Sequence, residues 1–208
     1  LPAYRVTVRG DQEREKPLNI QAPIVRHSTL RLLLAKAAKY DYEVVHMDIT
    51  GAFLQSTPFP STAPPKLMWL PRSMGGGMVR LNKALYGLGE ASHEWRTTYV
   101  DYLLSIGFVM AIYDPCLLIY RKGDLEILFP ICVDDSLFIT NRMDDAKAVL
   151  DQILRRFKGR VEGIPGKFLG TNYAMHLGLY ETNQAEYIDS ILKNYDLQDL
   201  KPVSTPQV

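Results

Sequence analysis

The sequence has few features that would tie it to a membrane, to an oxidising compartment or to the disordered class. It holds two cysteines in 208 residues, Cys116 and Cys132, and both lie in apolar stretches, which argues against a disulfide scaffold. No apolar run approaches the roughly 20 residues of a membrane span. Neither sign of charge dominates, because 24 Lys+Arg face 23 Asp+Glu, and a hydrophobic share of 47% can form a core. These absences exclude a membrane protein, a disulfide-rich protein and a disordered chain.

The even balance of charge hides a difference between the two halves of the chain. Residues 1–90 carry 12 basic and 7 acidic side chains, and residues 91–208 carry 12 basic and 16 acidic ones. A basic first half favours a polyanionic partner, although an ordinary solvated surface explains the same excess. The chain opens with Leu-Pro-Ala, without an initiator methionine or a signal peptide, so we expect it to be a fragment of a longer protein.

Hydrophobic periodicity predicts an α+β fold. One predicted helix follows an N-cap at Ser28, and three more cover 95–106, 143–157 and 184–195. The predicted strands cover 3–9, 44–49, 112–140 and 167–176. A turn at 122–124 divides the longest strand region. The last helix should bury a face made by Tyr187, Ile188, Ile191 and Leu192. Adjacent strands with short turns favour an antiparallel sheet with helices on one face.

Proline and glycine mark two places where regular structure should be interrupted. Residues 56–79 hold five prolines and three consecutive glycines, which predicts a loop excursion. Pro130 removes a hydrogen-bond donor from the strand before residue 133. That strand should therefore lie at a sheet edge or contain a bulge at Pro130.

Three acidic residues stand out because of their apolar surroundings. Asp134 and Asp135 separate the apolar runs 127–133 and 136–139, which predicts a buried hairpin with both acids at its tip. A plain turn is the alternative, although no Asn or Gly supplies the positive φ that tight hairpins prefer. Asp48 lies within the apolar run 44–49, where a lone ionised group is costly to bury unless it faces water at the end of the strand.

The three carboxylates would repel one another if they converged on neighbouring strands, unless a cation lay between them. Oxygen-only ligands with room for water suit Mg²⁺, which keeps part of its hydration shell and often binds substrate phosphates. Two such ions can clamp the attacking and leaving oxygens of a phosphoryl transfer. The acids therefore predict a metal-dependent phosphoryl-transfer site.

Several blocks of sequence occur in the order of a known family. They are APIVR (22–26) with LRLLLA (30–35), HMDITGAFL (46–54), LNKALYGL (81–88) with Trp95, DPCL (114–117), VDDSL (133–137), FLG (168–170) and KPVSTP (201–206). Together they cover nearly the whole chain. The sequence resembles the reverse transcriptase domain of Ty1/copia-type LTR retrotransposons, which is part of a Pol polyprotein.

The resemblance implies a right-hand polymerase, with an antiparallel palm sheet backed by helices. Fingers are expected at about 1–43 and 56–88, and the palm at about 44–55 and 89–176. Residues 177–208 are expected to begin the thumb or connection, and the chain has no RNase H or integrase segment. Such a protein would act inside the cell, in the cytoplasm or in a virus-like particle, without a membrane partner.

The implied reaction is RNA-directed DNA synthesis, in which a primer 3′-hydroxyl attacks the α-phosphate of a dNTP. The implied partners are an RNA or DNA template with its primer, and dNTPs; the sequence does not define the oligomeric state. The implied catalytic residues are Asp48, Asp134 and Asp135, and with Ile49 they would bind two ions of Mg²⁺, or of Mn²⁺ as the alternative.

The resemblance also assigns residues to the two substrates. Phe53 matches the position of a sugar gate that excludes a 2′-hydroxyl, although without the resemblance a core aromatic would explain it better. The implied dNTP-binding residues are Gly51, Ala52, Phe53, Tyr86 and Gly87. The candidates for nucleic-acid binding are Arg5, Arg9, Arg26, Phe168, Leu169 and Gly170; a solvated surface is the alternative for each arginine.

The chain departs from the family pattern close to the implied dNTP site. The family has Lys and Gln where this sequence has Gly89 and Glu90, and Pro and Arg where it has Ser92 and His93. Glu90 would place a negative charge near a triphosphate, which weakens the binding of a polyanion. Cys132 stands where a tyrosine is usual. These departures leave open a second interpretation, a catalytically inactive remnant that at most binds nucleic acid.

Overall fold

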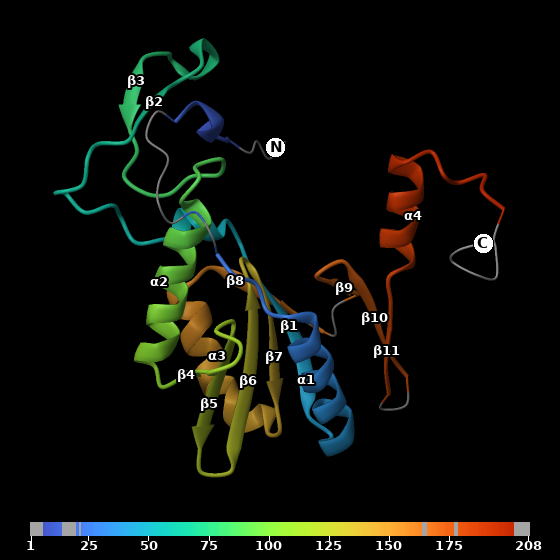
Figure 1. Cartoon of the computed structure of the whole chain (residues 1–208). Helices are drawn as coiled ribbons and strands as arrows, with labels where there is room; N and C mark the ends of the chain where they lie inside the picture. Colours follow the sequence, from blue (N-terminus) through green and yellow to red (C-terminus); the bar gives the residue numbers. More distant parts are fainter. Residues whose placement is uncertain (1–5, 14–19, 21, 164–165, 177–178, 202–208) are drawn as a thin grey trace.

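The protein is described from a computed structural model, which covers residues 6–13, 20, 22–163, 166–176 and 179–201. Its centre is a six-stranded antiparallel sheet with the strand order β4-β5-β6-β7-β1-β8 (Figure 1). These strands are β1 (Glu43–Ile49), β4 (Val109–Met110), β5 (Leu117–Lys122), β6 (Leu125–Cys132), β7 (Asp135–Thr140) and β8 (Gly159–Glu162). The antiparallel sheet and the α+β class are as predicted.

Three long helices pack on the central sheet, and they occupy both of its faces. Helices α2 (Ala91–Ser105) and α3 (Met143–Arg156) cover the face that carries Phe129 and Phe138. Helix α1 (His27–Tyr40) covers the other face, where its Lys36 forms an ion pair with Glu126 of β6. The prediction of helices on one face is therefore wrong. The reason is that β6 and β7 are largely apolar and are buried on both sides, so helices must cover both sides.

The core beneath α2 and α3 is a cluster of buried aromatic rings. Trp95 stacks on Tyr99 with 4.9 Å between ring centroids, and both rings meet Phe157 edge-on at 5.2 Å. Tyr99 also contacts Phe129 of β6. Each such ring buries a large apolar surface, and the edge-on geometry adds roughly 0.5–1.5 kcal/mol per pair. This cluster fixes α2 against the strands that carry the acidic residues.

The proline- and glycine-rich region contains more structure than predicted. Residues 67–69 and 78–80 pair as strands β2 (Leu67–Trp69) and β3 (Met78–Arg80), so the loop prediction is wrong for these residues. The short 3-10 helices η1 (Gly10–Gln12), η2 (Ala52–Gln55) and η3 (Arg72–Met74) complete the elements of the first half. The strand predicted at 3–9 is absent from 6–9, and residues 3–5 lie outside the described chain.

A second, three-stranded sheet has the order β11-β10-β9. Its strands are β9 (Lys167–Phe168), β10 (Thr171–His176) and β11 (Leu179–Asn183), and helix α4 (Ala185–Asn194) follows them. The helix itself is as predicted, but its expected burial is wrong, because Tyr187 and Ile188 are each 54% exposed. The helix extends away from the central sheet (Figure 1), and the described chain offers its apolar face no continuous partner.

Two local predictions fail because a remote residue or strand intervenes. Helix α1 begins one residue before Ser28, and Arg26 holds the N-cap position without a side-chain cap. The cap comes instead from Asp114, whose Oδ2 accepts hydrogen bonds from Arg26 N at 3.0 Å and Thr29 Oγ1 at 2.6 Å.

Pro130 lies in β6, a central strand without a bulge. The β6–β7 ladder simply omits 129–130 and resumes in the same register.

Candidate active site

The first part of the candidate site is the tight turn between β6 and β7. Cys132 pairs with Asp135, so Val133 and Asp134 form a two-residue turn, and Asp135 is the first residue of β7. Val133 has φ of +54°, which is an outlier for a β-branched residue because glycine usually occupies such a position. Its carbonyl accepts a hydrogen bond of 2.6 Å from the Trp95 indole, which fixes the strained turn on α2. The turn interpretation is thus correct, and it does not exclude a functional one.

The second part of the site is the end of β1, which lies beside this turn. The register of β1 and β7 places Asp48 directly opposite Asp135. Opposed residues of an antiparallel pair project from the same face of the sheet, so both side chains are on the face that carries α1. Ile49 N donates a hydrogen bond of 2.9 Å to the carbonyl of Asp134. The structure therefore brings together the backbone positions of the three predicted catalytic residues.

Three further polar side chains join Asp48 to Asp135. His46 Nε2 lies 3.1 Å from Asp135 Oδ1, and its Nδ1 lies 3.7 Å from Glu162 Oε2. Arg160 Nε lies 3.1 Å from both Glu162 Oε1 and Asp48 Oδ2. The sequence analysis did not identify these residues. Period-2 alternation would have placed His46 beside Asp48, but nothing in the sequence shows that 159–162 pair with β1.

The donor atoms of the site are the kind that Mg²⁺ prefers. Asp48 and Asp135 are partly exposed, by 24% and 43% of their side-chain surface, and offer carboxylate oxygens. Burial, and then the charges of Asp135 and Asp134, raise the pKa of the Cys132 thiol to about 12. Within the described ranges, no group of three or more His, Cys, Asp or Glu side chains is arranged to hold a metal. The donor chemistry fits the ion, while Asp48 is paired with Arg160.

The predicted dNTP-binding residues lie just beyond β1. Phe53 of η2 and Tyr86 place their ring centroids 4.6 Å apart, although 33 residues separate them in the sequence. Gly51 is the N-cap of η2, with a left-handed φ of +62°, and Ala52 is buried. Gly87 makes a close backbone approach within the chain itself, because a Cβ there would lie 1.9 Å from Val8 O. Val8 N also donates to Tyr86 O at 2.7 Å.

The predicted nucleic-acid contacts are more scattered. Arg9 pairs with Asp11 at 2.7 Å, and a hydrogen bond and the charge of Asp11 raise the Arg9 pKa. Arg26 is exposed at the start of α1, and Arg5 lies outside the described residues.

Leu169 and Gly170 form the turn between β9 and β10 and have positive φ, and Phe168 is the last residue of β9. Phe168 is buried, with its ring centroid 6.2 Å from that of His46. Of the three residues, Phe168 therefore approaches the candidate site, through His46.

The charge of Glu90, expected near the triphosphate, is partly offset by a lysine in the structure. Lys66 Nζ lies 2.7 Å from Glu90 Oε1 and 2.9 Å from Glu13 Oε1. Burial lowers the pKa of Lys66, but hydrogen bonds to Glu90 and Glu13 outweigh it and raise the pKa above its usual value. The departure at Glu90 is therefore part of a partly buried cluster in which one lysine is shared by two carboxylates, so its negative charge is only partly offset.

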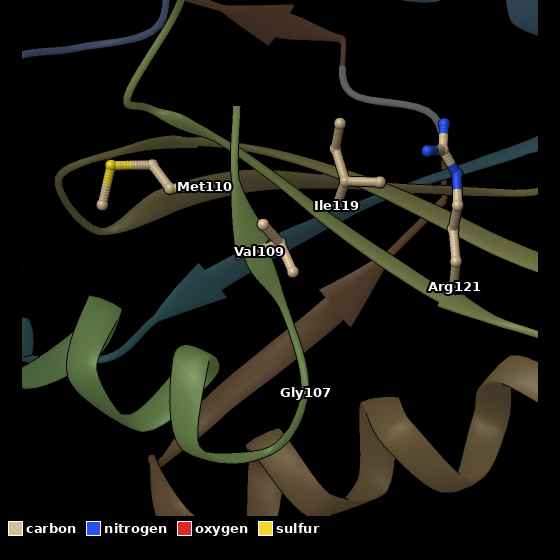
Figure 2. Close-up of a pocket in the computed structure, with 5 residues that line it drawn as sticks. All are labelled: Gly107, Val109, Met110, Ile119 and Arg121. Carbon is tan, nitrogen blue, oxygen red and sulfur yellow. The ribbon is translucent and has the colours of Figure 1, made fainter. Parts of the chain in front are cut away.

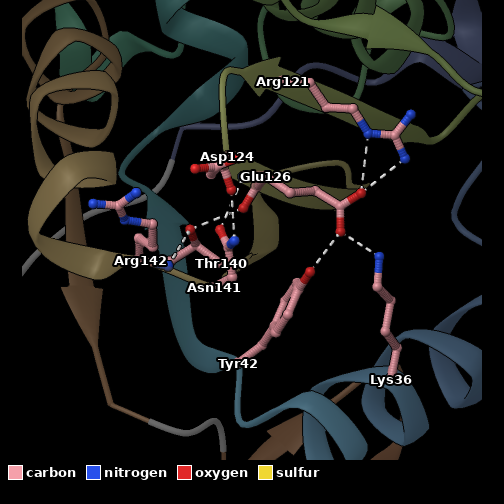
Figure 3. A network of polar contacts seen from close by, with 8 residues as sticks. All are labelled: Lys36, Tyr42, Arg121, Asp124, Glu126, Thr140, Asn141 and Arg142. Atoms are coloured by element: carbon pink, nitrogen blue, oxygen red, sulfur yellow. Dashed lines mark hydrogen bonds and ion pairs between the residues drawn. The ribbon is translucent and has the colours of Figure 1, made fainter.

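Two other polar or concave regions lie away from the aspartates. Figure 2 shows a depression lined by Gly107, Val109, Met110, Ile119 and Arg121, at the β4–β5 edge of the central sheet and so opposite to the β1–β8 edge. Figure 3 shows a network around Glu126 at the far end of β6. Neither region contains a predicted site residue.

Comparison with known proteins identifies the family of the chain that carries this sheet and its paired aspartates. A family model for reverse transcriptase (RNA-dependent DNA polymerase) matches residues 5–208. The chain belongs to this family.

Among its relatives are the Pol polyprotein of transposon RE1 of Arabidopsis thaliana, 29% identical over 89% of the chain, and that of transposon TNT 1-94 of Nicotiana tabacum, 26% identical over 97%. The Transposon Ty1-BL Gag-Pol polyprotein of Saccharomyces cerevisiae is 23% identical over 76%. These relatives confirm the resemblance to the reverse transcriptase domain of Ty1/copia-type elements.

The chain spans only a small part of these relatives. It covers 13% of the RE1 protein, 16% of the TNT 1-94 protein and 9% of the Ty1-BL protein. Across the part of the chain that the structure describes, none of the helices combines the length and the apolar character needed to cross a membrane.

Proposed function

We propose that this chain is the polymerase portion of a copia-type reverse transcriptase and extends a primer on an RNA or DNA template. The central sheet would be the palm, 1–43 and 56–88 the fingers, and 177–208 the start of the thumb or connection. The observation that carries the proposal is the placement of Asp48 opposite Asp135, beside the Asp134 turn, in a chain of this family. The proposed substrates are dNTPs and a primed template.

The proposed chemistry is the in-line attack of the primer 3′-hydroxyl on the α-phosphate of a dNTP, with release of pyrophosphate. Asp48, Asp134 and Asp135, with the carbonyl of Ile49, would hold two Mg²⁺ ions. The bound ions would neutralise charge on the transferring phosphoryl group. The protein would hold the carboxylates in place and release Asp48 from Arg160 when the site is loaded.

The remaining predicted residues would bind the nucleotide and the template with its primer. The Phe53 ring, braced by Tyr86 at 4.6 Å, would press on the sugar and reject a 2′-hydroxyl. The backbone at Gly51 and Ala52 would approach the triphosphate. Gly87 would keep Tyr86 in place through its contact with Val8. Arg5, Arg9 and Arg26 would contact phosphates, and the Phe168–Gly170 turn would approach the primer.

Primer extension tests this proposal. The parent chain should extend a DNA primer on an RNA template in Mg²⁺, and EDTA should abolish the reaction. Asp48→Asn and Asp134→Asn should each lower the rate by about 10³-fold or more, since each removes a charge that supplies several kcal/mol of transition-state stabilisation. Asp151→Asn, at an exposed aspartate of α3, is the matched control and should keep the parental rate. A parent without extension, or an Asp134→Asn variant equal to it, contradicts the proposal.

Binding without synthesis is the second candidate, and the β2–β3 hairpin favours it. Residues 49–89 contain no acidic side chain. The register places Leu67 opposite Arg80 and Trp69 opposite Met78, so these four share one exposed face, and Trp69 is 74% exposed. An exposed ring beside cations suits stacking on unpaired bases.

Salt titration of oligonucleotide binding distinguishes the two candidates. Under the second one, affinity should fall as salt rises, with a log–log slope that reports a few phosphate contacts, and no variant should synthesise DNA. Trp69→Ala should weaken binding, while the slope should persist. Affinity that does not change with salt would exclude this candidate.

A further inference from the structure

The polar side chains between the two paired aspartates include one that is mostly buried and in direct contact with a carboxylate. His46 lies two residues before Asp48 on β1, and only 11% of its side-chain surface is exposed. Its Nε2 is 3.1 Å from Asp135 Oδ1, within hydrogen-bond distance. An ionised carboxylate only accepts hydrogen bonds, so Nε2 must carry the hydrogen of this bond.

The His46 ring is packed on one further side, and a carboxylate lies near it beyond hydrogen-bond distance. The Phe168 ring meets it edge-on, at 77° between the planes and 6.2 Å between centroids. Glu162, its Cα partner on β8, places Oε2 3.7 Å from Nδ1. Arg160 then joins Glu162 to Asp48 with two contacts of 3.1 Å. The packing of Phe168 against the ring therefore restricts the orientation of His46 independently of its contact with Asp135.

Asp135 has no comparable packing of its own. Its side chain is 43% exposed at the open end of β7, and the last torsion of an aspartate is broad. A carboxylate that has to share a metal with Asp48 must keep one orientation. The bond from His46 supplies that restraint.

We propose that His46 is a positioning residue that holds the Asp135 carboxylate in one orientation, on the sheet face that also carries Asp48, by donating its Nε2 hydrogen. This inference rests on the proposed function and adds to it a residue outside the three predicted acids. Metal-bound carboxylates are commonly held by such hydrogen bonds, and loss of the partner typically costs 10–100-fold in metal affinity or activity. The contact with Phe168 also links the β9–β10 turn to the orientation of Asp135.

The test replaces His46 in two ways that separate hydrogen bonding from packing. His46→Gln keeps an N–H donor, while His46→Leu and His46→Met keep an apolar side chain without a donor. Two donor-free variants are made because the test needs only one of them to fold. His27→Leu, at an exposed histidine of α1, is the matched control. Thermal unfolding of each full-length variant shows that it is folded.

Two measurements are made, Mn²⁺ uptake by electron paramagnetic resonance and steady-state primer extension. The donor-free variants should bind Mn²⁺ about 10–100-fold more weakly or show kcat lower by that factor, with a smaller change in KM for dNTP. His46→Gln should recover most of the loss, and His27→Leu should match the parent.

The outcomes separate this assignment from the proposed function. If the parent binds Mn²⁺ and extends primers while the folded donor-free variants match it, the assignment is overturned and the proposed function stands. If folded His46→Gln fails as badly as His46→Leu, hydrogen bonding is not the role of His46, and the assignment is again overturned. A parent that takes up no Mn²⁺ and extends no primer overturns both.

Discussion

The two ends of the central sheet hold acidic residues in opposite circumstances. At one end, Glu126 of β6 accepts from Tyr42 at 2.9 Å, from Arg121 at 2.8 and 3.0 Å, and from Lys36 (Figure 3). Its side chain is 13% exposed. At the other end, Asp48 and Asp135 are more open, and the partners are Arg160 and His46.

The difference distinguishes a structural carboxylate from one that is available to a ligand. Burial raises the pKa of Glu126, but hydrogen bonds from Lys36, Arg121 and Tyr42 outweigh it and hold the pKa below its usual value. Such a group is fully satisfied and can bind nothing more. The side chains of Asp48 and Asp135 remain partly exposed, by 24% and 43% of their surface. The comparison predicts that the Glu126 end controls stability and the aspartate end controls activity.

The largest expected effect on stability is at Glu126. Glu126→Ala leaves Lys36 and Tyr42 partly buried without their acceptor, so the free energy of unfolding should fall by about 2–4 kcal/mol. Urea unfolding at neutral pH measures the loss. Glu181→Ala, at an exposed glutamate of β11, is the control and should change stability by less than about 0.5 kcal/mol. A Glu126→Ala protein as stable as the parent would remove the structural half of the comparison.

The next effect is at Asp114, which caps α1 from a distant loop. Burial raises the pKa of Asp114, but hydrogen bonds from Thr29, Arg26 N and Cys116 N outweigh it and lower the pKa. A lowered folded-state pKa adds stability that is present above the unfolded value, about 4, and is lost as the pH falls through the folded-state pKa.

Asp114→Asn should therefore cost about 1–2 kcal/mol at pH 7 and flatten the loss of stability below about pH 4. Urea unfolding at a series of pH values from 7 to 3 provides the measurement. Parallel stability curves for the parent and the variant would show that the cap does not depend on the charge of Asp114.

The smallest effect on stability is expected at the aspartates themselves. Asp135→Asn removes one of two like charges on facing positions and keeps the side-chain volume, so unfolding should change by less than about 0.5 kcal/mol. Primer extension by the same preparation should be lost. A large drop in stability at Asp135 would make both ends of the sheet structural and would weaken the proposed function.

The sequence was sufficient to predict most local elements, including the strand that carries Asp48 and the hairpin around Asp134. The apolar runs around Asp134 and the run before Asp48 predicted the hairpin and strand that now lie side by side. The 3.6-residue periodicity also predicts helices α2 and α3, because their buried residues recur every three or four positions.

The errors arise where tertiary contacts override local pattern. Asp114 caps a helix 88 residues away, and no local signal at Arg26 reveals this. Pro130 is tolerated in a central strand because the ladder to β7 omits it, a feature that needs the register to be known. The apolar stripe of α4 predicted burial wrongly, because no residue of the helix is buried against the described chain. Arg160 and Glu162 reach the site only because β8 pairs with β1.

The indole bond to the strained turn has a practical consequence. The chain has two tryptophans, and Trp95 is fully buried with its N–H on the Val133 carbonyl, next to Asp134. In a Trp69→Phe background, the intrinsic fluorescence of the protein would come from Trp95 alone. Any ligand that shifts the turn would change the polarity around that indole and so its emission wavelength. The fold thus carries a built-in optical reporter of what happens at Asp134.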